Sequence, residues 1–459
     1  MTRRTMMAVL AASLVPAAAG AQTLSRAEAV TLAIANNPEV RKSHQALLSL
    51  HGQGKEALAD ALPEVTVYGS STRYRDPSLL NSSSFDAFPP ELREALRPVP
   101  QNLFDGTAQL KQTLYSFKLG RAIKAARYAV SMGEEQEKGV TRSVVLDTIR
   151  AYNEYLLDVE KVKVAEKAVK QQESHVAMAK NRRAAGVATD LEVLRLQVAL
   201  ENQRVVYERT RGQADFARGA LNAAMVRPID APVEPSDSLV HQDFEVSLET
   251  VVQEAMANRS EVKAAQLAVR VNDELIGVVR GEFRPSLDLN AAWGYSVRRP
   301  GNFFSGDYTR WNAAITLTIP VFDGFRNSGK VAQAKARRES ADQDRIALEN
   351  QIRLSAKQAR DVLVTAGRVL EAADLNVTQA QKALDMTQAN YSLGAATPLD
   401  VLDAQAALTL AESLRLEALY AHANARAVLR WVMGRDPLDT APPSASLEAQ
   451  TKEIGRAHV

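Results

Sequence analysis

Two segments in the second half of the chain alternate between apolar and polar residues, and this pattern predicts β-strands at 286–298 and 308–320. Strands of about ten residues with one apolar and one polar face are typical of membrane-spanning sheets. Weaker copies of the pattern predict strands at 64–74 and 106–115. The second pair contains four aromatic residues that are candidates for a girdle at the membrane interface, with packed core positions as the alternative: Trp293, Tyr295, Tyr308 and Trp311.

Segments with a helical period surround these strands. Segments 118–184 and 326–392 predict helices of about 67 residues, each about 100 Å long. Shorter helices are predicted at about 25–61, 192–225, 247–283 and 400–433, and two of these stacked end to end match one long helix. The second long helix has small or apolar residues in unbroken steps of four and three, which predict a left-handed coiled-coil seam: Ile352, Ala356, Ala359, Leu363, Ala366, Leu370, Ala373, Val377, Ala380, Leu384, Thr387 and Tyr391.

The order helix, two strands, long helix, helix occurs twice, which predicts an internal duplication. Residues Ala35-Asn36 and Glu39-Val40 recur as Ala257-Asn258 and Glu261-Val262. The segment from Gly186 to Leu194 recurs from Gly394 to Leu402. We therefore expect a first repeat at 22–235, a second repeat at 236–437 and a C-terminal tail at 438–459.

The first residues have the pattern of a secretory signal peptide, with Arg3-Arg4 before an apolar stretch and Ala19-Gly20-Ala21 as the cleavage site. This predicts removal of residues 1–21 and export of the chain. The apolar stretch is too short to span a membrane, and no later stretch is long enough to form a transmembrane helix. Entry into a membrane would therefore require a β-barrel. Four strands cannot close one, whereas three copies would provide twelve, so a homotrimer is the simplest assembly.

Composition excludes several kinds of chemistry. The chain contains no cysteine, which excludes disulfides, zinc–thiolate sites and a cysteine nucleophile. Its six histidines are scattered, and its net charge of +2 does not favour nucleic acid as a partner. Gly324, Gly329 and Lys330 have the spacing of a phosphate-binding loop, but Val331 stands where that loop needs Ser or Thr. We predict no enzyme activity, no cofactor and no metal site.

Two turns between helices contain the remaining candidate chemistry. Gly186 and Gly394 suit left-handed backbone at these turns. Thr189 with Glu192, and Thr397 with Asp400, have the spacing of capping boxes, and capping alone could account for both acidic residues. Capping does not account for Asp403, which shares a helix face with Asp400.

The whole pattern resembles the TolC family of outer-membrane efflux and type I secretion exit ducts. The resemblance covers about 22–437 and depends on four motifs in addition to the duplicated order. The resemblance implies an α+β fold. In this fold, three chains form a twelve-stranded outer-membrane barrel that is continued by a periplasmic α-helical coiled-coil tunnel. It also implies a periplasmic adaptor, an inner-membrane ABC or RND-type pump and outer-membrane lipid as partners. The motifs are Asn-Asn-Pro-Glu-Val at 36–40, Pro-Val-Phe-Asp-Gly at 320–324, Tyr-Ser-Leu-Gly at 391–394 and Asp-Val-Leu-Asp-Ala at 400–404.

The resemblance also implies roles for residues at the two turns. Asp400 and Asp403 match the family's acidic constriction, for which Glu192 and Arg195 are the first-repeat counterparts. Tyr391 matches a tyrosine of the family's closing latch. The latch arginine is replaced by Ala396, and Arg195 could substitute for it by pairing with Asp403 or Glu192. The residues implied to contact the adaptor are Gly186, Thr189, Leu393, Gly394 and Thr397.

The sequence leaves two alternatives and one question open. A soluble periplasmic coiled-coil scaffold would share the long helices, but it would not need strands with one apolar face. A periplasmic adaptor should contain a compact β-rich domain and an inner-membrane anchor, and neither is evident in the sequence. The pattern does not distinguish a drug, a metal ion or a secreted protein as cargo.

Overall fold

The computed structural model describes residues 22–438, apart from 83, 84, 86 and 243. The predicted signal peptide and nearly all of the predicted tail lie outside the described residues. The described chain forms two compact units, and three segments contribute to the first: 22–44, 136–262 and 348–438. The second unit consists of 45–135 and 263–347. In the described residues, no helix is both long and apolar enough to cross a membrane.

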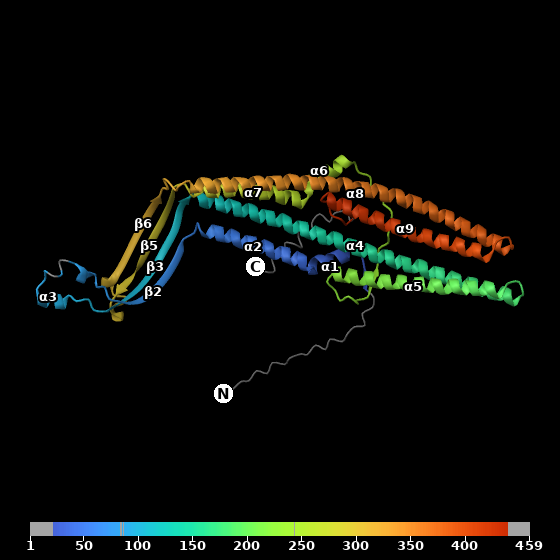
Figure 1. Cartoon of the computed structure of the whole chain (residues 1–459), viewed down its shortest axis with the longest axis horizontal. Coiled ribbons are helices and arrows are strands. Elements are labelled where there is room, and N and C mark those ends of the chain that lie inside the picture. Colours follow the sequence, from blue (N-terminus) through green and yellow to red (C-terminus); the bar gives the residue numbers. More distant parts are fainter. Residues whose placement is uncertain (1–21, 83–84, 86, 243, 439–459) are drawn as a thin grey trace, which may run out of the picture. The chain divides into compact units, whose positions relative to one another are not determined.

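The second unit contains a four-stranded antiparallel sheet (Figure 1). Its strand order is β2 (Glu64–Tyr74), β3 (Gln101–Ser116), β5 (Ser286–Val297) and β6 (Thr309–Thr318). β3 begins at Gln101 rather than at 106 as predicted, because the outer end of β2 pairs with it as far as Tyr74–Gln101. A row of residues across the sheet contains Tyr68, Thr107, Gly294 and Arg310, which shows that the mainly polar faces of all four strands lie on the same side of the sheet.

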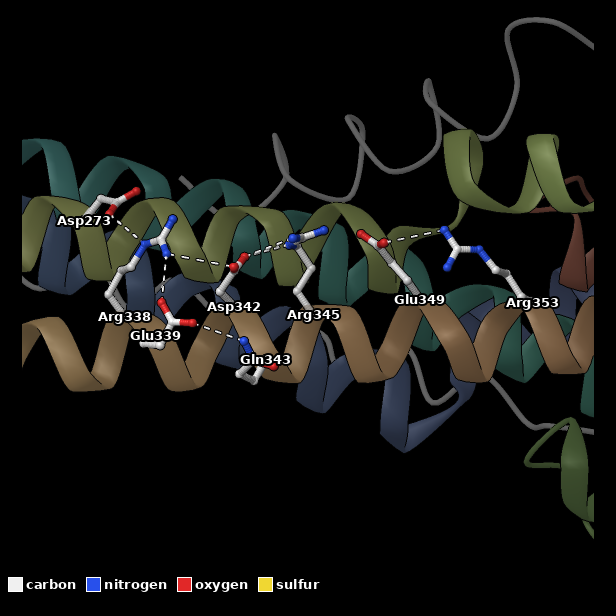
Figure 2. A network of polar contacts seen from close by, with 8 residues as sticks. All are labelled: Asp273, Arg338, Glu339, Asp342, Gln343, Arg345, Glu349 and Arg353. Carbon is white, nitrogen blue, oxygen red and sulfur yellow. Dashed lines mark hydrogen bonds and ion pairs between the residues drawn. The ribbon is translucent and has the colours of Figure 1, made fainter.

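The second unit also contains the short helix α3 (Pro90–Ala95) and parts of four longer helices: α2 (Pro38–Ala59), α4 (Phe117–Ala184), α7 (Ser260–Gly281) and α8 (Arg326–Ser392). Ion pairs join neighbouring helices here. Glu282, just beyond α7, binds Lys330 of α8 at 2.7 Å and Lys118 of α4 at 3.5 Å. Farther along, Arg338 of α8 binds Asp273 of α7 at 3.2 Å and is part of a chain of charged residues along α8 (Figure 2).

Two helices predicted as continuous are interrupted. The segment predicted at 25–61 forms α1 (Arg26–Asn36) and α2, and the segment predicted at 247–283 forms α6 (Leu248–Asn258) and α7. Asn37 is extended because it precedes Pro38, whose ring disfavours helical backbone at the preceding residue. Arg259 is also extended, and its buried guanidinium lies over the Trp431 ring at 4.4 Å.

The first unit contains a layer of four helix segments in the order α5 (Asp190–Ala224), α4, α9 (Pro398–Val432) and α8 (Figure 1). The predicted seam of α8 is confirmed, because every one of its residues is buried or half-buried. That seam packs against α9, and an apolar cluster likewise joins α4 to α5. Between α4 and α9 the contacts include polar pairs: Lys161–Glu417 at 2.7 Å, Lys167–Glu412 at 2.8 Å and Gln171–Gln405 at 2.7 Å.

A short parallel pair of strands, β1 (Gln22–Leu24) and β4 (Val233–Pro235), was not predicted. Two tyrosines of α4 bind this pair. The Tyr152 hydroxyl donates to the Leu24 carbonyl at 2.8 Å, and the Tyr155 hydroxyl donates to the Val233 carbonyl at 2.6 Å. Burial raises the pKa of Tyr152 to about 12. The neutral phenol is therefore the form that stabilises the fold.

Tyr152→Phe should lower the free energy of unfolding by about 1–2 kcal/mol at neutral pH, because the hydroxyl also accepts from the Asp237 N–H at 3.3 Å and both hydrogen bonds are lost. Because the pKa of Tyr152 is raised in the folded state, the stabilisation that this tyrosine provides is fully present below pH 10 and is lost as the pH rises toward 12. The variant should therefore lose less stability over that range. Denaturant unfolding at several pH values measures both effects. Tyr74→Phe changes a more exposed tyrosine and is the control. Equal losses of stability with rising pH in the wild type and both variants would contradict the role assigned to Tyr152.

Candidate functional site at the helix turns

The two turns between paired helices have the same backbone geometry. Gly186 and Gly394 both have φ = +76°, the left-handed region that glycine adopts without strain. In each turn a backbone N–H bonds back across the helix end: Val187 N to Arg182 O at 2.9 Å, and Ala395 N to Asn390 O at 2.8 Å. Each turn therefore reverses the chain between two antiparallel helices.

The helices that follow the turns begin differently. The Thr397 hydroxyl accepts from the Asp400 N–H, and the Asp400 carboxylate accepts from the Thr397 N–H at 2.7 Å, so this capping box is complete. The Thr397 hydroxyl also donates to the Asp400 carboxylate at 2.8 Å. The hydrogen bond from the Thr397 N–H, followed by this one, lowers the pKa of Asp400. The Thr189 hydroxyl also accepts from the Glu192 N–H, but the Glu192 carboxylate binds elsewhere. Asp400 is thus a capping residue, whereas Glu192 is available for another contact.

Glu192 joins the two turns through Tyr391. The Tyr391 hydroxyl donates to Glu192 Oε1 at 3.1 Å, and the Arg182 guanidinium lies over the Tyr391 ring at 4.7 Å. Burial, followed by the contact with Glu192, raises the pKa of Tyr391. The end of α8 is therefore held against both helices of the first hairpin. Tyr391 was predicted as a latch residue from the sequence, whereas Arg182 was missed.

The remaining predicted turn residues are exposed. Asp403 and Arg195 both face solvent, and among the described residues no ion pair joins Arg195 to Asp403 or to Glu192. Leu393 is 81% exposed and Val187 is 62% exposed, so each turn presents an apolar side chain at its tip. Val187 directly follows the turn glycine and lies between the predicted contact residues Gly186 and Thr189.

A second group of candidate residues lies at the end of the sheet that faces away from the helices. Trp293 and Tyr295 are in edge contact at 5.3 Å, and Trp293 pairs in register with Trp311, which is largely exposed. Phe303 folds back over Gly106, where an added Cβ would lie 3.0 Å from its ring. Tyr308 lies in the same loop and is partly exposed. At the other end of β6, Phe322 and Phe325 form an exposed pair that was not predicted as a girdle.

A family model described as outer membrane efflux protein matches residues 29–226 and 251–435. The chain belongs to the outer membrane efflux protein family. Outer membrane protein OprJ of Pseudomonas aeruginosa is 25% identical over 386 residues, covering 82% of this chain and 77% of OprJ. The alkaline protease secretion protein AprF of the same species is 23% identical over 338 residues, covering 72% of this chain and 69% of AprF.

Solved structures agree on the fold. The Campylobacter jejuni CmeC outer membrane channel has a TM-score of 0.76 and 16% identity, with coverage of 93% of this chain and 89% of CmeC. The Neisseria gonorrhoeae MtrE outer membrane channel, in an open state, has a TM-score of 0.74 and 17% identity, with coverage of 90% and 89%. The predicted α+β channel fold is therefore confirmed.

Family membership confirms three predictions made from the sequence. The resemblance to the TolC family is correct, the chain acts as an exit duct for efflux or secretion, and it is located in the outer membrane. The alternative of a soluble periplasmic scaffold or adaptor is wrong, because the family match covers both repeats. The family is one of transport channels.

Tyr391→Phe should raise the conductance of the channel, because it removes the bond to Glu192 and keeps the ring beneath Arg182. Single-channel recording in planar bilayers measures the change. Glu192→Gln should have a smaller effect, since an amide oxygen can still accept the hydroxyl. Ser392→Ala, at the neighbouring exposed residue, is the control. Wild-type conductance in Tyr391→Phe would show that this contact does not hold the turns together.

Proposed function

We propose that the chain assembles as a homotrimer into a passive exit duct whose four-stranded sheets form one twelve-stranded barrel and whose helices form a periplasmic tunnel gated at the turns. The observation that carries this proposal is a second heptad stripe on each edge helix of the four-helix layer. On α5 the stripe is Leu191, Leu194, Val198 and Val205, all more than half exposed. On α8 the exposed stripe includes Val362, Val369, Ala372, Ala383 and Met386.

The two stripes support a closed ring of copies. α5 and α8 each use one seam inside the chain, and each has this second stripe on its free side. Packing α5 of one copy against α8 of the next would cover both stripes and repeat around an axis. The sheet supports the same assembly, because β2 and β6 each have only one neighbour among the described strands.

Val205→Asp should prevent assembly, because it would bury a charge in the contact between copies. Val206→Asp is a matched control, since the adjacent valine is exposed to a similar degree but lies off the stripe. Native mass spectrometry or blue native electrophoresis of detergent-extracted protein distinguishes trimer from monomer. Equal trimer content in both variants would contradict the proposed contact.

The gate is assigned to the turns. In the trimer, Asp403 would contribute a ring of carboxylates that favours cations and narrows the opening, with Asp400 capping the helix behind it. Tyr391, Glu192 and Arg182 would hold the closed arrangement, and Arg195 is a candidate partner for Asp403 of a neighbouring copy. Unchanged conductance in Arg195→Glu would exclude that last role.

The turns are also the proposed adaptor contact. Gly186, Thr189, Leu393, Gly394 and Thr397 present two similar surfaces, each with an apolar tip residue. An adaptor that binds these surfaces could connect the duct to an inner-membrane ABC or RND-type pump, which would provide the energy. The exposed aromatic residues at both ends of β6 would lie at the two faces of the outer membrane. We propose no catalytic activity and no nucleic-acid partner.

The relatives transport different cargo, so the class of cargo is left open. The names of the similar proteins include a cation efflux system protein, a toluene efflux pump protein and an alkaline protease secretion protein. A duct that conducts passively leaves the choice of cargo to its pump. The function proposed for this chain is therefore conduction and gating.

Asp403→Asn should raise single-channel conductance and reduce the preference for cations, because it removes one carboxylate per copy from the ring. Asp385→Asn removes another exposed carboxylate about two turns before Gly394 and should change neither property. Reversal potentials in a KCl gradient measure the preference. The same cation preference in Asp403→Asn and wild type would place the constriction elsewhere.

A further inference from the structure

An arginine on the polar face of the sheet crosses a neighbouring strand to reach its partner. Arg310 of β6 lies opposite Gly294 of β5, which in turn lies opposite Thr107 of β3. The Arg310 guanidinium is 3.4 Å from Asp105 Oδ1 and donates to Thr107 Oγ1 at 3.3 Å. Strands lie about 4.8 Å apart, so the side chain spans two strand spacings.

Gly294 makes this crossing possible. A Cβ at this position would lie 2.1 Å from the Gly106 carbonyl oxygen and 2.9 Å from Thr107 Oγ1. Any side chain there would therefore collide with β3 and block the path of Arg310. At Gly294, the position that the Arg310 guanidinium crosses, the polar face has no side chain.

The two charges are not equally accessible. The Asp105 side chain is 14% exposed, whereas the Arg310 side chain is 54% exposed. The Asp105 carboxylate is thus largely covered, whereas the Arg310 guanidinium is exposed. The other charged residues in the matched rows of this face lie nearer the helices: Glu64 opposite Lys111, and Asp288, which accepts from Thr113 at 3.0 Å. In the matched rows near the strand-joining loops, Arg310 and Asp105 are the charged residues of the polar face.

We propose that Arg310, positioned across Gly294 by Asp105, determines charge selectivity at the outer mouth of the duct. This inference depends on the proposed function, in which the polar face lines the lumen. Each copy would present one guanidinium to a passing ion and keep the compensating carboxylate against the wall. The outer mouth would favour anions weakly, in contrast to the acidic turns. Asp105 is a positioning residue, because without it the long side chain is free to extend into the lumen.

Substitutions of opposite charge test the assignment. Each variant is made in an Asp403→Asn background, so that the turn carboxylates contribute equally, and reversal potentials are recorded in a KCl gradient. Arg310→Gln should raise the ratio of potassium to chloride permeability by about twofold, and Asp105→Asn should lower it by about the same factor. Asp105→Asn should also reduce conductance. The double variant should return close to the background value.

Arg73→Gln is the matched control, because Arg73 lies near the same end of the sheet on the opposite, apolar face, paired in register with Asn102. It should leave selectivity unchanged. Channels with no change in Arg310→Gln, or with shifts in the same direction in both single variants, would overturn the inference. Failure of the wild-type chain to form any channel would instead overturn the proposed function.

Discussion

Unsatisfied edges are the constraint on which the rest of this structure depends. Inside a bilayer, each backbone N–H and C=O group needs a partner from the protein, because water is absent. The sheet of one chain ends in β2 and β6, each with one neighbour in the described residues. The helix layer ends in α5 and α8, whose outer stripes are exposed. The sheet and the helix layer therefore each have two free edges, which further copies would cover in the proposed trimer.

Duplication explains why the two turns match and why they differ. Both copies retain a left-handed glycine and a threonine cap, because these residues are required to reverse the chain between helices. The acidic residue that follows has been used in two ways. The Asp400 carboxylate binds back to its own helix end and completes the capping box. Glu192 is one methylene longer and binds Tyr391. A repeated structural motif has thereby gained one contact between hairpins.

The sequence predicted the structural features that depend on the local spacing of apolar residues. It missed those that depend on contacts between residues far apart in the chain. The seam from Ile352 to Tyr391 was predictable because steps of four and three determine which face of a helix is buried. The helix break at Asn37 could also have been predicted from the sequence, because Pro38 follows it. At the break between α6 and α7, the extended Arg259 contacts Trp431, which lies far away in the chain. Likewise β1 and β4 are too short to show a period, and Arg182 could not be paired with Tyr391 before the helices were placed.

The contacts at the turns are weak enough for a binding partner to break. One hydrogen bond contributes about 1 kcal/mol and one partly exposed cation–π contact contributes about 0.5–1 kcal/mol. In the proposed trimer these contacts would favour the closed state by about 5 kcal/mol, or a few thousandfold. An adaptor must therefore bind the open turns about that much more tightly than the closed turns. Binding energies of this size are ordinary for protein interfaces, so opening needs no energy source at the turns themselves.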